Sequence, residues 1–107
     1  MEDYEIARFY LGKPGTEAST VYTVPAGQTV ILRHIAVSNT TDTAAKLCIT
    51  VTSGGADVEI VPNIEITKLF DWATERVLQD GDSIKVSQTT AGSLTLELNG
   101  VVRVSGD

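Results

Sequence analysis

Short runs of alternating apolar and polar residues, divided by turn residues, fill this chain and constrain its fold more than any other feature. Alternation with a period of two places successive side chains on opposite faces of a β-strand, and helical periodicity is almost absent. Turn signals rich in glycine, proline, asparagine and aspartate recur roughly every 8–12 residues, as in two-sheet all-β domains. The sequence therefore predicts an all-β fold: an antiparallel β-sandwich or jelly roll of about eight or nine strands.

The alternating runs predict the positions of nine strands. They cover residues 5–11, 20–24, 29–39, 46–52, 58–61, 64–70, 83–89, 94–98 and 101–104. The longest, residues 29–39, is apolar on both faces, which indicates a central strand covered on its core side and partly covered on its back. One face carries Ile31, Arg33, Ile35 and Val37, and the other carries Val30, Leu32, His34 and Ala36.

Local signals add inward positions and turns to this pattern. The positions predicted to face the core are Leu47, Ile49, Val51, Ile64, Ile66, Leu69 and Leu96. Asp71 is a good helix cap, so residues 71–78 are predicted to form one short helical turn. Pro62-Asn63 is predicted to end the strand before it, because proline cannot donate to a ladder. Asn99-Gly100 is typical of a tight hairpin turn and is predicted to join the last two strands.

Length and charge limit the classes of protein to consider. A chain of 107 residues with 42% hydrophobic residues is predicted to fold as a single domain, residues 1–107. Its formal net charge of −6 argues against nucleic-acid binding, which needs clustered lysine and arginine. No apolar run approaches the ~20 residues of a membrane-spanning helix, and the acidic start lacks the basic region of a signal peptide. We therefore expect synthesis as a soluble cytoplasmic protein.

The chain lacks a set of residues that would support catalysis, so it is predicted not to be an enzyme. Its single histidine, His34, lies in mid-strand, where spacing supplies no partner for metal binding or nucleophilic catalysis. Its single cysteine, Cys48, lies in an apolar run, which favours a small hydrophobic role over a nucleophile. Asp80 and Asp82 flank a glycine, but two carboxylates are too few for the six to eight oxygen ligands of calcium. No catalytic, cofactor-binding or metal-ligating residue is predicted.

Two long segments resemble a pattern found in small virion proteins of tailed bacteriophages. They are residues 22–35 (YTVPAGQTVILRHI) with Val37 and residues 39–41, and residues 61–63 through 77–84 (VLQDGDSI) to 98–101 (LNGV). The resemblance covers nearly the whole chain, from Ala7 to Val104. It is weakest over residues 68–76, which are predicted to carry a particle-specific contact or to form a variable loop.

The resemblance implies a structural protein encoded among phage head and tail genes, with a β-sandwich fold, no enzymatic role and an oligomeric state. The leading hypothesis is a capsid decoration (auxiliary or cement) protein that binds the outer surface of the head as a homotrimer. Its partners would be copies of itself and the major capsid protein or tail proteins, without a cofactor, in the virion. The alternative is a tail, baseplate or fibre-associated module that binds a host-surface carbohydrate or another tail protein.

Four residues are predicted to lie at an interface: Arg33 and His34 on the long strand, and Phe70 and Trp72 beyond it. The Phe70 and Trp72 pair and the apolar back of residues 29–39 are the surfaces that assembly would bury. Phe70 and Trp72 could instead form, with Tyr22, a platform for a sugar ring. A saccharide role and an assembly role both stay open at this stage.

Overall fold

The structure, a computed structural model, describes residues 2–105. Over these residues the chain forms eight β-strands and no helix. The strands are β1 (Glu2–Gly12), β2 (Ser19–Thr23), β3 (Gln28–Asn39), β4 (Ala45–Ser53), β5 (Ala56–Ile66), β6 (Leu69–Leu78), β7 (Ser83–Gln88) and β8 (Leu94–Ser105). The predicted all-β fold is confirmed, and this part of the chain holds no helix that could span a membrane.

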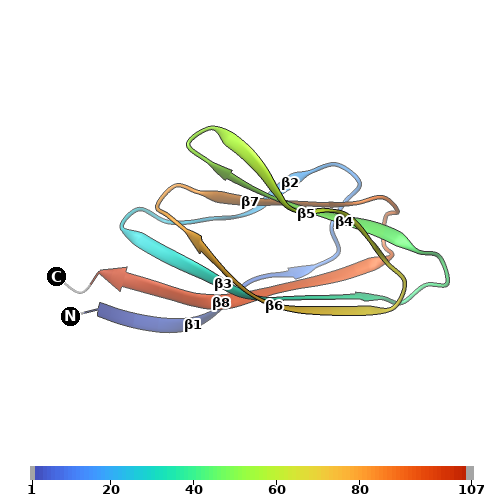
Figure 1. The fold of residues 1–107 in the computed structure, drawn as a ribbon, viewed down its shortest axis with the longest axis horizontal. Helices are drawn as coiled ribbons and strands as arrows, with labels where there is room; N and C mark the ends of the chain where they lie inside the picture. Colours follow the sequence, from blue (N-terminus) through green and yellow to red (C-terminus); the bar gives the residue numbers. More distant parts are fainter. Residues whose placement is uncertain (1, 106–107) are drawn as a thin grey trace.

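The strands form two antiparallel sheets stacked face to face (Figure 1). The first sheet has the order β1-β8-β3-β6 and the second has the order β2-β7-β4-β5. Among the connections within residues 2–105, only the one between β4 and β5 joins neighbours in a sheet, and every other connection crosses to the opposite sheet. This is the strand order of an eight-stranded jelly roll. β3 is a central strand, as the sequence predicts.

Aliphatic side chains from the inner faces of both sheets fill the space between them. The core consists of Phe9, Val24, Val30, Leu32, Ile35, Val37, Ala45, Leu47, Ile49, Val61, Ile66, Leu78, Ile84, Val86, Leu94, Leu96 and Leu98. The predicted inward positions Leu47, Ile49 and Leu96 are buried, and Val51 is half-buried and packs against the core. Leu69 was predicted inward but is 70% exposed, because β5 ends at Ile66 and the following turn restarts the alternation.

A β-bulge at Arg33 changes which residues of β3 face the core. The pairing of β3 with both β6 and β8 shifts between Leu32 and His34. Val30 and Leu32 before the bulge, and Ile35 and Val37 after it, are therefore all buried. Strict alternation placed these two pairs on opposite faces, and the extra residue is the reason that prediction was wrong.

Asn99-Gly100 does not form the predicted hairpin. β8 passes straight through this dipeptide and pairs with both β1 and β3. A side-chain carbon at Gly100 would lie 2.0 Å from the carbonyl oxygen of Ile31 and 2.8 Å from the ring of Phe9. Glycine is thus required at this position because another part of the backbone approaches it closely within the sheet, as is common for a glycine inside a strand.

Residues 71–78 are strand and not helix. They belong to β6, which pairs with β3 from Ser38↔Leu69 to Val30↔Leu78. Trp72 and Thr74 on one side of β6 are half-buried, whereas Asp71, Ala73 and Glu75 on the other side are exposed. Sheet pairing therefore overrides the helix-capping signal of Asp71.

Pro62 and Asn63 interrupt β5 without ending it. β5 is the outer strand of the second sheet, where a missing N–H faces no neighbouring strand. The pairing of β4 with β5 shifts at this point, between Leu47↔Ile64 and Ile49↔Val61, and Asn63 has a φ of 52°. The predicted strand end is thus an irregularity within a longer strand.

Candidate functional site

Arg33 and His34 lie side by side on the outer face of the first sheet. The bulge turns both side chains away from the core, so they are next to each other although they are consecutive in a strand. Arg33 forms an ion pair with Glu75 at 3.5 Å, and the Nε2 atom of His34 contacts the carboxylate of Asp71. Both partners belong to the neighbouring strand β6, so these contacts link β3 to β6 across the sheet surface.

Phe70 and Trp72 lie on the opposite, inner side of β6. Their rings pack together with centroids 4.1 Å apart and planes inclined by 34°. β6 is the last strand of its sheet, so this aromatic pair stands at the open margin of the sandwich. The structure therefore brings the four predicted residues onto two paired strands, but it divides them between two different surfaces.

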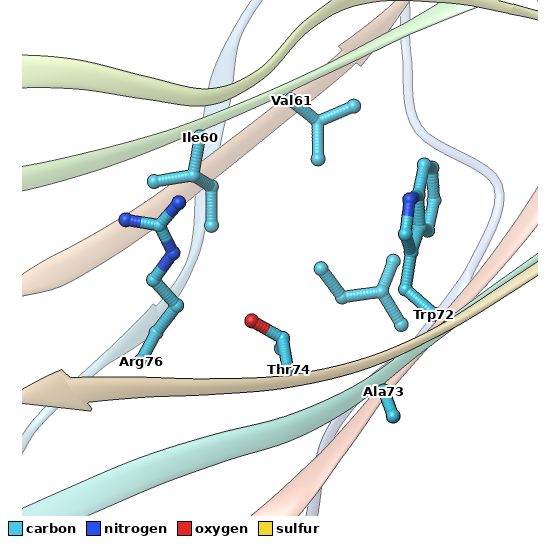
Figure 2. A pocket seen from close by; sticks show the side chains of 7 residues that line it. Ile60, Val61, Trp72, Ala73, Thr74 and Arg76 are labelled. Atoms are coloured by element: carbon cyan, nitrogen blue, oxygen red, sulfur yellow. The ribbon is translucent and has the colours of Figure 1, made fainter.

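A hollow of about 160 Å³ opens at this margin, between the two sheets (Figure 2). It is lined by Ile35, Ile60, Val61, Trp72, Ala73, Thr74 and Arg76. Ile60 and Val61 from β5 point toward Trp72 and Arg76 from β6. Sites for small molecules usually measure 300–1,000 Å³. The hollow is therefore sized for a single side chain of a partner rather than for an enclosed cofactor.

Sequence reasoning missed Ile60 and Arg76 as neighbours of Trp72. The signal for Arg76 was available: it shares the period-two side of β6 with Phe70 and Trp72, but the helical prediction for residues 71–78 hid that alternation. Ile60 could not be found in this way, because β5 and β6 belong to different sheets and the position of Ile60 opposite Trp72 depends on how the sheets stack.

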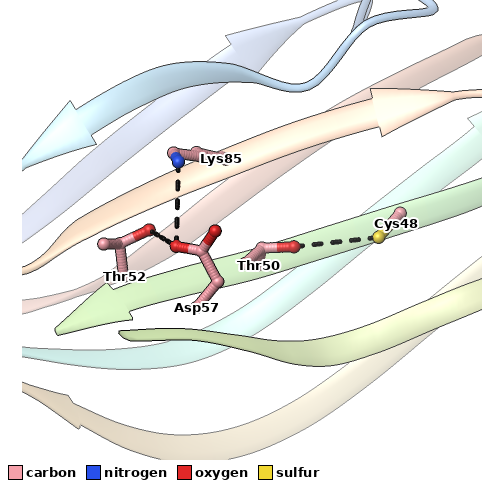
Figure 3. Close-up of polar contacts among 5 residues, drawn as sticks. All are labelled: Cys48, Thr50, Thr52, Asp57 and Lys85. Atoms are coloured by element: carbon pink, nitrogen blue, oxygen red, sulfur yellow. Dashed lines mark hydrogen bonds and ion pairs between the residues drawn. The ribbon is translucent and has the colours of Figure 1, made fainter. Parts of the chain in front are cut away.

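The outer face of the second sheet is polar (Figure 3). Thr50 and Thr52 of β4 lie beside Cys48, whose sulfur is 3.8 Å from the Thr50 hydroxyl. The carboxylate of Asp57 accepts a hydrogen bond from the Thr52 hydroxyl at 2.6 Å and lies 3.7 Å from the Lys85 amine. The hydrogen bond and the lysine charge lower the pKa of Asp57. Cys48 is half-buried and not fully buried, and this face carries the side chains expected of a solvated surface.

Asp80 and Asp82 hold turns together. Asp80 accepts a hydrogen bond from the backbone N–H of Gly27 at 2.9 Å, and Asp82 accepts one from the backbone N–H of Gln79 at 2.8 Å. Two backbone hydrogen bonds between Val24 and residues 81–82 bring the β2–β3 turn against the β6–β7 turn. Each carboxylate thus serves a separate backbone donor. Within residues 2–105, no three His, Cys, Asp or Glu side chains gather as metal ligands would.

Comparison with known proteins shows the fold. No protein-family model and no curated protein matches the chain. Among solved structures, a chain of the T13 particle of infectious bursal disease virus matches 98% of this protein with a TM-score of 0.61 at 7% identity. A chain from the Gx strain of the same virus matches 99% with a TM-score of 0.62 at 9% identity. This protein spans only 31% and 34% of those two chains.

A pentameric capsid protein from metagenomic phage sequences matches more weakly. It has 16% identity and a TM-score of 0.41 over 92% of this chain and 62% of its own. We draw no conclusion from this third match, because the TM-score is below 0.5. The two stronger matches establish that this protein has the β-sandwich architecture of a domain found in those viral chains.

Proposed function

We propose that this protein is a non-enzymatic structural component of a bacteriophage virion, namely a capsid decoration protein that binds the outer surface of the head as an oligomer. The observation that carries the proposal is the jelly-roll strand order of the two sheets, which aligns over nearly the whole chain with chains from virus particles. The resemblance of residues 22–35 and 77–84 to tailed-phage virion proteins supports the same role from sequence.

The surfaces of the molecule fit attachment to a larger assembly. The β5–β6 margin offers a hollow with an apolar wall, formed by Ile60, Val61 and Trp72, and Arg76 at its rim. Arg76 forms no ion pair within the described part of the chain. An apolar side chain with a nearby carboxylate, presented by a capsid subunit, would fill the hollow and pair with this guanidinium.

The test is whether the purified protein binds to particles made by a phage from which the gene for this protein has been deleted. We expect the protein to sediment with these particles and to saturate at a fixed number of copies. Trp72→Ala should weaken this binding at least ~10-fold, as for a central aromatic anchor, while Thr50→Ala on the polar face of the second sheet should not. Binding to tails but not to isolated heads would contradict a decoration role, and no binding to either would contradict the virion role.

Binding of a host-surface carbohydrate by a tail or baseplate module is the second candidate, because Trp72 and Thr74 combine an aromatic ring and a hydroxyl in one hollow. Its test is a saccharide array probed with the purified protein. Specific binding that Trp72→Ala abolishes would favour this candidate. Since the Phe70 ring already packs against Trp72, one face of the indole is partly covered, and we favour the protein-binding role.

A further inference from the structure

The outer face of the first sheet carries a row of four aliphatic side chains, one from each strand. Ile6 of β1 pairs with Val101 of β8, Val101 with Ile31 of β3, and Ile31 with Val77 of β6. We call these four residues the aliphatic row. Ile6 is 93% exposed and Val77 is 57% exposed. Ile31 and Val101, on the two central strands, are half-buried. The row therefore crosses the whole width of the sheet and is most exposed at its two ends.

Other exposed apolar side chains gather on the same face. Tyr4, Leu11 and Leu69 also point outward from β1 and β6. A shallow hollow of about 140 Å³ lies between Leu11 and Leu69, over Ala36 and Ser38 of β3. Charged side chains such as Arg8, Arg33 and Glu75 lie between these two leucines and the aliphatic row. Exposed apolar groups that are rimmed by polar residues in this way mark interaction sites. The outer face of the second sheet differs from this face, because its side chains are polar (Figure 3).

The charges on this face balance, unlike those of the whole molecule. Consider the part of this face that lies between Tyr4 and Leu11 along β1 and beside them on the other strands. The outward cationic residues there are Arg8, Arg33 and Arg103, and the outward anionic residues are Asp71, Glu75 and Glu97. Arg8 pairs with Glu97 and Arg33 with Glu75, each at 3.5 Å. The whole chain carries a formal charge of −6. Two copies would repel one another through most of their surfaces, but they can approach through this neutral face without that penalty.

We infer that the outer face of the first sheet is covered by the same face of a second copy of this chain. A two-fold axis parallel to the strands, passing between the two central members of the row, places Ile6 of each copy opposite Val77 of the other. The same axis places Arg8 opposite Glu75 of the other copy, so opposite charges meet at both ends of the contact. Two sheets packed in this way have the arrangement of the layers in a β-sandwich.

The size of the face is sufficient for such a contact. Its four strands are 10 to 12 residues long. With about 4.8 Å between strands and about 3.3 Å per residue, the face covers roughly 600 Å². Two faces together bury roughly 1,200 Å² or more, which is the lower end of the range for specific protein interfaces. The aliphatic row supplies the apolar part of this contact, and the ion-paired residues Arg8, Arg33, Glu75 and Glu97 lie beside it.

The test is the native mass of the purified full chain by light scattering and sedimentation equilibrium, across a range of concentrations. We expect twice the 11.4 kDa of one chain. Ile6→Lys should weaken pairing at least ~100-fold, because the two-fold axis repeats the substitution and each buried isoleucine contributes about tenfold or more. The side chain of Ile6 is almost fully solvent-exposed within one copy, so this change leaves the fold intact, which circular dichroism checks.

Val58→Lys is the matched control, since it adds the same charge at a 55% exposed aliphatic position of β5, away from this face. It should leave the mass doubled. A wild-type monomer, a trimer, or equal weakening by both lysine variants would overturn the inference. The mass measurement contains no particle, so a monomer would contradict the two-fold pair but not the proposed virion role. Conversely, a dimer that fails to bind particles would contradict the virion role but not the two-fold pair.

Discussion

Gly100 lies in the middle strand of three, and a side-chain carbon there would meet both the carbonyl of Ile31 and the ring of Phe9. We predict that Gly100→Ala lowers the free energy of unfolding by about 1–3 kcal/mol, because the backbone carbonyl cannot give way as a flexible side chain can. Chemical denaturation measures the loss. Gly15→Ala, where nothing lies within 4 Å of the added carbon, is the control and should change stability little. Equal effects of the two substitutions would contradict this placement of β8.

Leu96 is fully buried between the sheets, whereas Leu69 is 70% exposed. We predict that Leu96→Ala costs about 2–4 kcal/mol, the range for removing a buried leucine side chain and leaving a cavity. Leu69→Ala removes the same atoms from a solvated position and should cost under ~0.5 kcal/mol in the isolated chain. A loss below ~1 kcal/mol for Leu96→Ala would show that the alternation in β8 is misplaced by one residue.

The pKa of Asp57 is lowered by its hydrogen bond from Thr52 and by the charge of Lys85. Folding therefore favours the ionised carboxylate, so its contribution to stability is present above the ordinary pKa of about 4 and is lost as the pH falls through the lowered value. We predict that Asp57→Asn flattens the acid side of the stability curve, measured as the denaturation midpoint against pH. Asp42→Asn, in the exposed β3–β4 loop, is the control and should keep the wild-type slope.

At the scale of the strands, two turns that are far apart in sequence lock one end of the sandwich. Asp82 is 7% exposed and accepts the backbone N–H of Gln79, whereas the exposed Asp80 reaches the backbone of Gly27 in the other turn. We predict that Asp82→Ala costs about 1–3 kcal/mol, because it leaves a backbone donor without its acceptor, and that Asp80→Ala costs less. Thermal unfolding measures both. A rise in melting temperature with added calcium would contradict the purely structural role of these carboxylates.

Strand positions could be predicted from this sequence because the period-two pattern is local, as in Leu47, Ile49 and Val51 of β4. The bulges could not, because the extra residue at Arg33 is set by the pairing of β3 with two distant neighbours. The same holds for Gly100, whose role depends on strand contacts that no turn rule contains. Where the local signal and the sheet pairing disagreed, as at Asp71, the pairing decided the structure.

At the scale of the whole molecule, the sandwich could be predicted but the crossing connections between its sheets could not, since they depend on which distant strands pair. The predicted interface residues show the same limit. Arg33 and Phe70 lie on paired strands yet face different surfaces, and the aliphatic row joins Ile6 to Val77 from opposite ends of the first sheet. The homotrimer expected from sequence stays a prediction, and it competes directly with the two-fold pair inferred from this face.

The proposed virion role is tested by cryo-electron microscopy of virus particles from the source of this gene, compared with particles that lack the gene. We predict additional density on the outer surface of the head into which the two-sheet sandwich, 50 × 26 × 17 Å, fits in symmetry-related copies. Identical heads in the two maps, with the chain absent from purified particles by mass spectrometry, would contradict it.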